Sequence, residues 1–155
     1  MKTARFFLAA AALVSCVGTA IAQNPNAEPN YGELSLDAGF TDDPRVISLR
    51  AGGDIPASRA GNGCRGFITS APDVRLHYDA GSYPLIISVD AGSDTTLVVN
   101  APDGNFYCDD DSGEGTNPSI RFSNPRAGRY EIWVGTYSSG NSQPARLHIS
   151  EVSSQ

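Results

Sequence analysis

PDGNFYCDDDSGEGTNP, which spans residues 102–118, places a short aromatic run directly before a cysteine and a group of acidic residues. The run Phe106-Tyr107 has the aromatic character of a β-strand, and two glycines break the acidic part into a loop. Four acids fall within six positions of this loop: Asp109, Asp110, Asp111 and Glu114. We therefore expect one strand end to carry both a covalent link through Cys108 and an oxygen-rich loop.

The rest of the chain predicts an all-β fold. From Tyr31 onward, short runs rich in Val, Ile, Thr, Tyr and Phe are separated by glycine, proline and aspartate. Several runs alternate cleanly between apolar and polar residues, which is typical of half-buried antiparallel strands in a sandwich or barrel. The predicted strands are 33–36, 45–50, 66–70, 74–78, 85–89, 96–100, 105–108, 119–123, 130–136 and 145–150.

Residues 1–22 have the pattern of a secretory signal peptide. Lys2 and Arg5 form a basic start, an apolar run follows, and Ala20-Ile21-Ala22 provides small residues for cleavage before Gln23. A lipid attached to Cys16, within the lipobox-like Leu13-Val14-Ser15-Cys16, is the alternative. We expect an exported protein, periplasmic or secreted, in which residues 23–31 are a flexible segment and 32–155 form one domain.

Charge and cysteine content agree with export. Without Lys2 and Arg5 the chain has 9 basic and 17 acidic side chains, a net charge near −8, and it has no lysine. This disfavours nucleic acid or an anionic membrane as the main partner. Cleavage or lipidation also removes Cys16 from consideration, so Cys64 and Cys108 are predicted to form a disulfide. No later apolar run approaches the length of a membrane helix.

An ordered series of short motifs resembles a known family. It comprises Gly39-Phe40-Thr41-Asp42-Asp43-Pro44, Ala51-Gly52-Gly53, Pro72-Asp73-Val74, Asp94-Thr95-Thr96-Leu97, Pro102-Asp103-Gly104, Cys108-Asp109-Asp110-Asp111, and Ala127-Gly128-Arg129-Tyr130 with Trp133-Val134-Gly135. Together these motifs are similar to the bacterial pre-peptidase C-terminal domain family, over roughly residues 34–151. The resemblance implies a jelly-roll-like β-sandwich with an accessory, adhesion or substrate-binding role, and structural calcium as in collagen-binding relatives. We expect the domain to occur here without an accompanying peptidase domain.

The acidic loop is the candidate metal site. Calcium prefers six to eight oxygen ligands, and crowded carboxylates repel one another unless a cation neutralises them. We expect Asp109 and Asp111 to be the first ligands of a calcium ion, with Asp110, Glu114 and Asn117 in support. The alternative is a solvated acidic loop without a metal. Asp94 and Asp103 are expected to serve turns.

Two other functions remain as alternatives. Trp133, Tyr137 and Tyr107 are a candidate ligand face for a polysaccharide or an extracellular protein, although the same pattern also fits Trp133 in the core. Gly135 would lie on the same face of its strand as Trp133, and it predicts that another backbone segment approaches closely there. A hydrolase has little support: Ser112 lacks the surroundings of a protease nucleophile, and His77 and His148 are expected to be exposed. We expect a non-catalytic monomer that uses no cofactor other than calcium.

Overall fold

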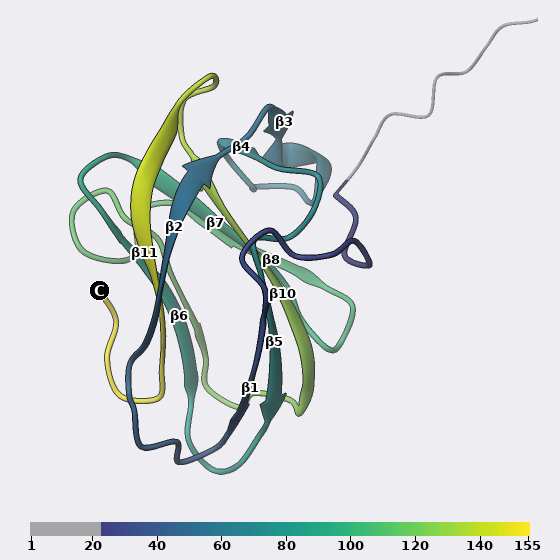
Figure 1. Ribbon diagram of the computed structural model, residues 1–155, viewed down its shortest axis with the longest axis vertical. Coiled ribbons are helices and arrows are strands. Elements are labelled where there is room, and N and C mark those ends of the chain that lie inside the picture. Colours follow the sequence, from purple (N-terminus) through teal and green to yellow (C-terminus); the bar gives the residue numbers. More distant parts are fainter. Residues whose placement is uncertain (1–22) are drawn as a thin grey trace, which may run out of the picture.

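The computed structural model describes residues 23–155 and shows a two-layered β-sandwich (Figure 1). The predicted signal peptide and Cys16 lie outside the described residues. Each of the ten predicted strands overlaps an observed strand, and one two-residue strand and a 3-10 helix are additional. The elements are β1 Glu33–Asp37, β2 Arg45–Gly52, β3 Ile55–Pro56, η1 Ala57–Arg59, β4 Phe67–Ile68, β5 Val74–Asp79, β6 Leu85–Ala91, β7 Thr95–Asn100, β8 Phe106–Asp109, β9 Ser119–Phe122, β10 Gly128–Thr136 and β11 Ser142–Ser150.

The first sheet is built around β10, the longest of its strands. β5 and then β1 lie on one side of β10, and β7 and then β8 lie on the other. The short strands β4 and β3 continue from the far end of β10. β1 runs parallel to β5, whereas the prediction was an antiparallel sandwich. No hairpin joins these two strands, so no tight turn imposes an antiparallel direction on them.

The second sheet has the order β2-β11-β6-β9 and is antiparallel throughout. Its inward residues, such as Leu147 and Ile87, pack against inward residues of the first sheet, such as Leu76 and Ile132. β8 and β9 are each the last strand of a sheet, and they lie at the same edge of the sandwich.

A second apolar cluster lies on the outer face of the first sheet. Ile132 and Val134 belong to the main core, so Trp133 between them faces the other way. The segment that carries β3, η1 and β4 covers this face, at one end of the sandwich (Figure 1). The members of the cluster are Ala57, Cys64, Ile68, Val98 and Trp133.

Residues 23–31, for which the composition suggested a flexible segment, lie against the first sheet. The backbone N–H of Asn24 donates to Ser70 O at 2.9 Å, and that of Tyr31 donates to Asp73 O at 2.7 Å. The guanidinium of Arg75 donates to the carbonyls of Pro25 and Ala27. These contacts hold the segment in place, so it is part of the folded domain. No helix among residues 23–155 is long and apolar enough to cross a membrane.

Candidate functional site

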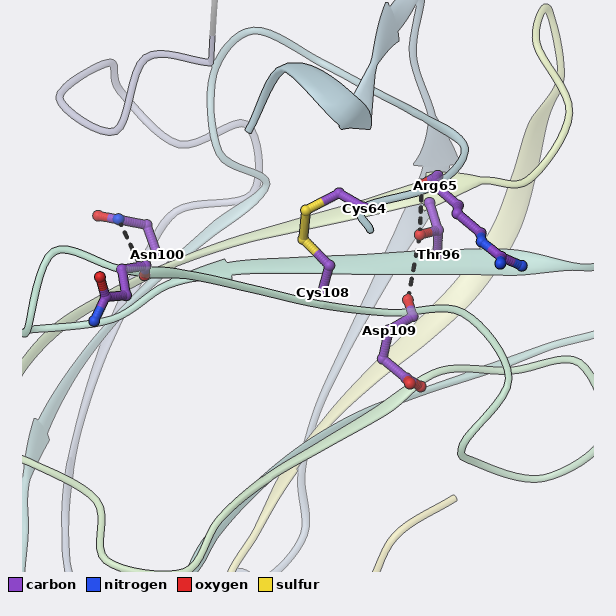
Figure 2. Close-up of a disulfide and its surroundings, with 7 residues drawn as sticks. Cys64, Arg65, Thr96, Asn100, Cys108 and Asp109 are labelled. Atoms are coloured by element: carbon purple, nitrogen blue, oxygen red, sulfur yellow. Dashed lines mark hydrogen bonds between the residues drawn. A yellow bond between two sulfur atoms is a disulfide. The ribbon is translucent and has the colours of Figure 1, made fainter. Parts of the chain in front are cut away.

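The predicted disulfide between Cys64 and Cys108 is confirmed, with a Cα–Cα distance of 5.1 Å (Figure 2). It connects the covering segment to β8, immediately before the acidic loop. The hydroxyl of Thr96, on the neighbouring strand β7, lies 2.8 Å from Arg65 O and 3.2 Å from Asp109 O, between the two linked chains (Figure 2). The start of the acidic loop is therefore held by a covalent bond and by hydrogen bonds.

Asp109 organises the loop that follows. Its Oδ2 accepts the backbone N–H groups of Ser112 and Ser119 at 2.9 and 2.8 Å, and its Oδ1 accepts the Ser112 hydroxyl at 2.7 Å. Three donors thus converge on one carboxylate, and hydrogen bonds to a charged acceptor are stronger than those between neutral groups. In this arrangement Asp109 fixes the backbone of the loop, a role that the sequence reasoning did not foresee.

Asn117 anchors the other end of the loop. Its side chain is buried, its Oδ1 accepts the Thr95 hydroxyl at 2.9 Å, and its Nδ2 donates to Ala91 O at 3.1 Å. The partners lie at the end of β6 and the start of β7, strands of different sheets. The acidic loop therefore packs on the connection between these two strands, which also carries Asp94.

The remaining acids of the loop differ in their exposure. Asp110 forms an ion pair with Arg65, Nη1 to Oδ2 3.4 Å, while Asp111 and Glu114 are exposed. Partial burial and then the charges of Asp111 and Asp110 raise the pKa of the Asp94 carboxyl above its usual value. Asp94 is thus within electrostatic range of Asp110 and Asp111. These carboxylates do not form a ligand group as they stand: within residues 23–155, no three His, Cys, Asp or Glu side chains are gathered closely enough to hold a metal ion.

The fold separates the three aromatic residues of the candidate ligand face. Trp133 is fully buried beneath the covering segment, so it cannot stack on a ligand, and the core alternative is correct. Tyr137 is 44% exposed in the β10–β11 connection, and Tyr107 is 36% exposed at the sandwich edge. The ring of Tyr107 instead packs edge-on against Phe122, with centroids 5.0 Å apart. The predicted aromatic trio is therefore not one surface.

The histidines and Ser112 do not form a catalytic group. Ser112 donates its hydroxyl to Asp109, as a loop contact. His77 is exposed as predicted, with Nε2 3.1 Å from Glu33 Oε2. His148 was expected to be exposed but is only 7% exposed, and burial and the nearby Arg146 lower its pKa. The two histidines lie on strands of different sheets.

Three buried acids that sequence reasoning overlooked have structural partners. Glu131 pairs with Arg75 at 2.6 Å and with Arg129 at 2.8 Å. Asp73 accepts the Val134 N–H, and Glu151 accepts the Gly39 N–H through both oxygens. The strand alternation indicated the outward phase of Glu131, but nothing in it indicated that the N-terminal segment lies over Arg75.

One family model matches part of the chain. Residues 75–136, from β5 to the end of β10, match the model of the bacterial pre-peptidase C-terminal domain. This match confirms the predicted resemblance over residues 75–136. Domains of this family are non-catalytic accessory modules found attached to peptidases.

Two solved structures match most of this chain. One is the pre-peptidase C-terminal domain of a collagenase from Bacillus anthracis, with 17% identity, 81% of this chain and 99% of that chain covered, and a TM-score of 0.46. The other is PliG of Aeromonas hydrophila, a periplasmic inhibitor of g-type lysozyme, with 14% identity, 80% and 98% covered, and a TM-score of 0.40. No curated protein sequence is matched.

Proposed function

We propose that this protein is a non-catalytic exported binding module whose acidic loop is stabilised by calcium. The family of residues 75–136 and the disulfide support an exported accessory role, because disulfides persist in oxidising compartments. The buried acids support a non-catalytic role, since Asp73, Glu131 and Glu151 are all occupied by contacts that hold the sandwich together.

The observation that carries the calcium proposal is that desolvation, together with the charges of Asp111 and Asp110, raises the pKa of Asp94. These residues come from two adjacent turns, which Asn117 holds together. Neighbouring carboxylates repel one another, and a divalent cation relieves that repulsion. Asp109 keeps the loop backbone in place, while Asp94, Asp110 and Asp111, supported by Glu114, turn toward a common ion. Backbone carbonyls and water complete its coordination.

Thermal unfolding of the oxidised protein, in EDTA and then in excess calcium, tests the proposal. Calcium at 100 times its dissociation constant adds about 2.7 kcal/mol to the free energy of unfolding, which raises the midpoint by several degrees. The double substitution Asp94→Asn and Asp111→Asn should abolish this rise. In EDTA the same variant should be at least as stable as the wild type, because the repulsion is gone.

Asp54→Asn is the matched control, since Asp54 is an exposed aspartate in a different loop. The control should keep the full response to calcium. A midpoint that calcium does not change, or a rise that survives in the double variant, would contradict the calcium proposal. Hydrolysis of a peptide or glycan bond by the purified protein would contradict the non-catalytic part.

A further inference from the structure

A small cavity opens where the edge strands of the two sheets meet. Its volume is ≈ 210 Å³, and it lies between β8, β9 and the turns that adjoin them. Aromatic rings form its apolar part, and polar side chains stand around them. The residues that line the cavity include Asp103, Tyr107, Phe122, Asn124, Arg126 and Tyr130.

Hydrogen bonds and ring contacts hold the cavity in shape. The Tyr130 hydroxyl donates to Arg126 O at 2.8 Å and accepts the Arg126 N–H at 3.1 Å, which fixes the β9–β10 loop. Asp103 accepts the Tyr107 hydroxyl at 2.8 Å and orients that ring. Phe122 packs edge-on against both Tyr107 and Tyr130, at 5.0 and 5.4 Å. A site that is formed before its ligand arrives binds at a lower entropic cost.

The two charged groups of the cavity have opposite charges and opposite hydrogen-bonding roles. The guanidinium of Arg126 is exposed and can only donate, while the Asp103 carboxylate can only accept. Hydrogen bonds from the Asn105 N–H and the Tyr107 hydroxyl lower the pKa of Asp103, so it stays ionised. Asp103 disfavours an anionic ligand and Arg126 disfavours a cationic one. A neutral ring with several hydroxyl groups satisfies both, because each hydroxyl donates and accepts.

Size restricts the ligand further. Pockets that enclose drug-sized molecules have volumes of ≈ 300–1,000 Å³, so this smaller cavity suits a single ring. The half-exposed ring of Tyr107 offers a flat apolar face to the C–H groups of such a ring.

We propose that this cavity binds one pyranose ring of a neutral polysaccharide, stacked on Tyr107 and hydrogen-bonded by Arg126 and Asp103. The proposal rests on the non-catalytic binding function above and supplies its ligand class. The ligand site is then at the sandwich edge. Of the three residues predicted for the ligand face, it includes Tyr107 but not Trp133 or Tyr137.

The test is a titration of the isotope-labelled, oxidised full-length exported protein with methyl glycosides of neutral hexoses and N-acetylhexosamines, followed by amide NMR shifts. Shifts should concentrate in residues 101–107 and 122–130. Tyr107→Ala and Arg126→Ala should each weaken binding at least about tenfold. The Arg126→Ala variant should fold normally, because the side chain that it removes is exposed and the loop contacts are made by the backbone of residue 126. A loss of binding in this variant therefore does not reflect misfolding. Tyr83→Ala, at an exposed tyrosine in the β5–β6 turn, should bind like the wild type.

Glycosides that cause no shifts in these segments up to their solubility limit would overturn the proposal. Shifts that a proline-rich peptide causes and no glycoside causes would also overturn it. Equal glycoside affinities of the Arg126→Ala variant and the wild type would overturn it as well. Running the titration in EDTA and in calcium separates the two proposals, since the cavity contains no residue of the acidic loop. Cleavage of a glycoside during the titration would overturn the non-catalytic function and leave the binding site intact.

Discussion

Gly135 marks the point where the covering segment comes closest to the first sheet. A Cβ atom at this position would lie 2.3 Å from Phe67 O and 2.7 Å from the Ile68 and Thr96 methyl carbons. The backbone oxygen cannot move aside as the end of a flexible side chain can. The close approach predicted from the sequence is therefore confirmed, and it is the reason that Trp133 can be covered.

Gly135→Ala should destabilise the protein by about 1–3 kcal/mol, because overpacking forces the backbone of the covering segment to shift. Chemical denaturation of the oxidised protein measures this change. Gly92→Ala is the control: no atom lies within 4 Å of its Cβ, so its midpoint should stay close to that of the wild type. Equal midpoints for the two variants would show that the segment is not tightly packed at residue 135.

At the scale of elements, the segment with β3, η1 and β4 acts as a cover on the first sheet. It has only two-residue strands, so few ladder hydrogen bonds hold it. Ile68, Ala57 and the disulfide at Cys64 secure it over Trp133. In the chain-entropy model, closing a loop over a sequence separation of 44 contributes about 4 kcal/mol.

Replacing both cysteines by serine should loosen this cover before the sandwich unfolds. Trp133 is the single tryptophan of the chain, so its fluorescence reports directly on the covering segment. We expect the emission to move to longer wavelength while the far-ultraviolet circular dichroism of the sheets persists, and the unfolding midpoint to fall. Unchanged emission would mean that apolar packing alone holds the segment.

Over residues 23–155, the first and last described segments lie against different sheets. The N-terminal segment contacts the first sheet through Arg75 and Asp73. At the other end, Gln155 N donates to Ser88 Oγ on the second sheet at 3.1 Å. Asp73 joins three parts of the fold, because its carboxylate accepts both the Asn30 amide and the Val134 N–H.

The buried Asp73 makes stability depend on pH. Desolvation raises its pKa to about 6, although its two hydrogen bonds oppose the rise. Between about pH 4 and 6 the folded state then binds more protons than the unfolded state, so this group's contribution to stability falls as pH rises. The loss reaches about 3 kcal/mol above pH 6. The Asp73→Asn variant should lack this pH-dependent contribution to stability. Subtracting its free energy of unfolding from that of the wild type at each pH isolates the contribution of Asp73. Parallel profiles would contradict the raised pKa.

Local patterns were enough for much of the fold. Runs rich in strand-forming residues, bounded by glycine, proline and aspartate, located ten of the strands, because these signals lie in neighbouring residues. The boundaries were less accurate: β10 begins at Gly128 and β11 at Ser142, where pairing with Tyr78 and Gly52 extends strands through residues that are poor strand formers. The composition of the acidic loop was evident, but it did not reveal that Asp109 turns inward to the backbone of Ser112.

The sequence by itself determined the all-β class, the Cys64–Cys108 pair and the close approach at Gly135, since strand alternation, cysteine count and a missing side chain are all visible along the chain. Only the tertiary structure decided that Trp133 and His148 are buried, that residues 23–31 are docked, and that Asp94 is within electrostatic range of Asp110 and Asp111. Alternation separates the two faces of a strand but does not say whether another segment covers the second one. That cover comes from residues distant in the sequence, such as Cys64 above Trp133, whose contacts exist only after the chain has folded.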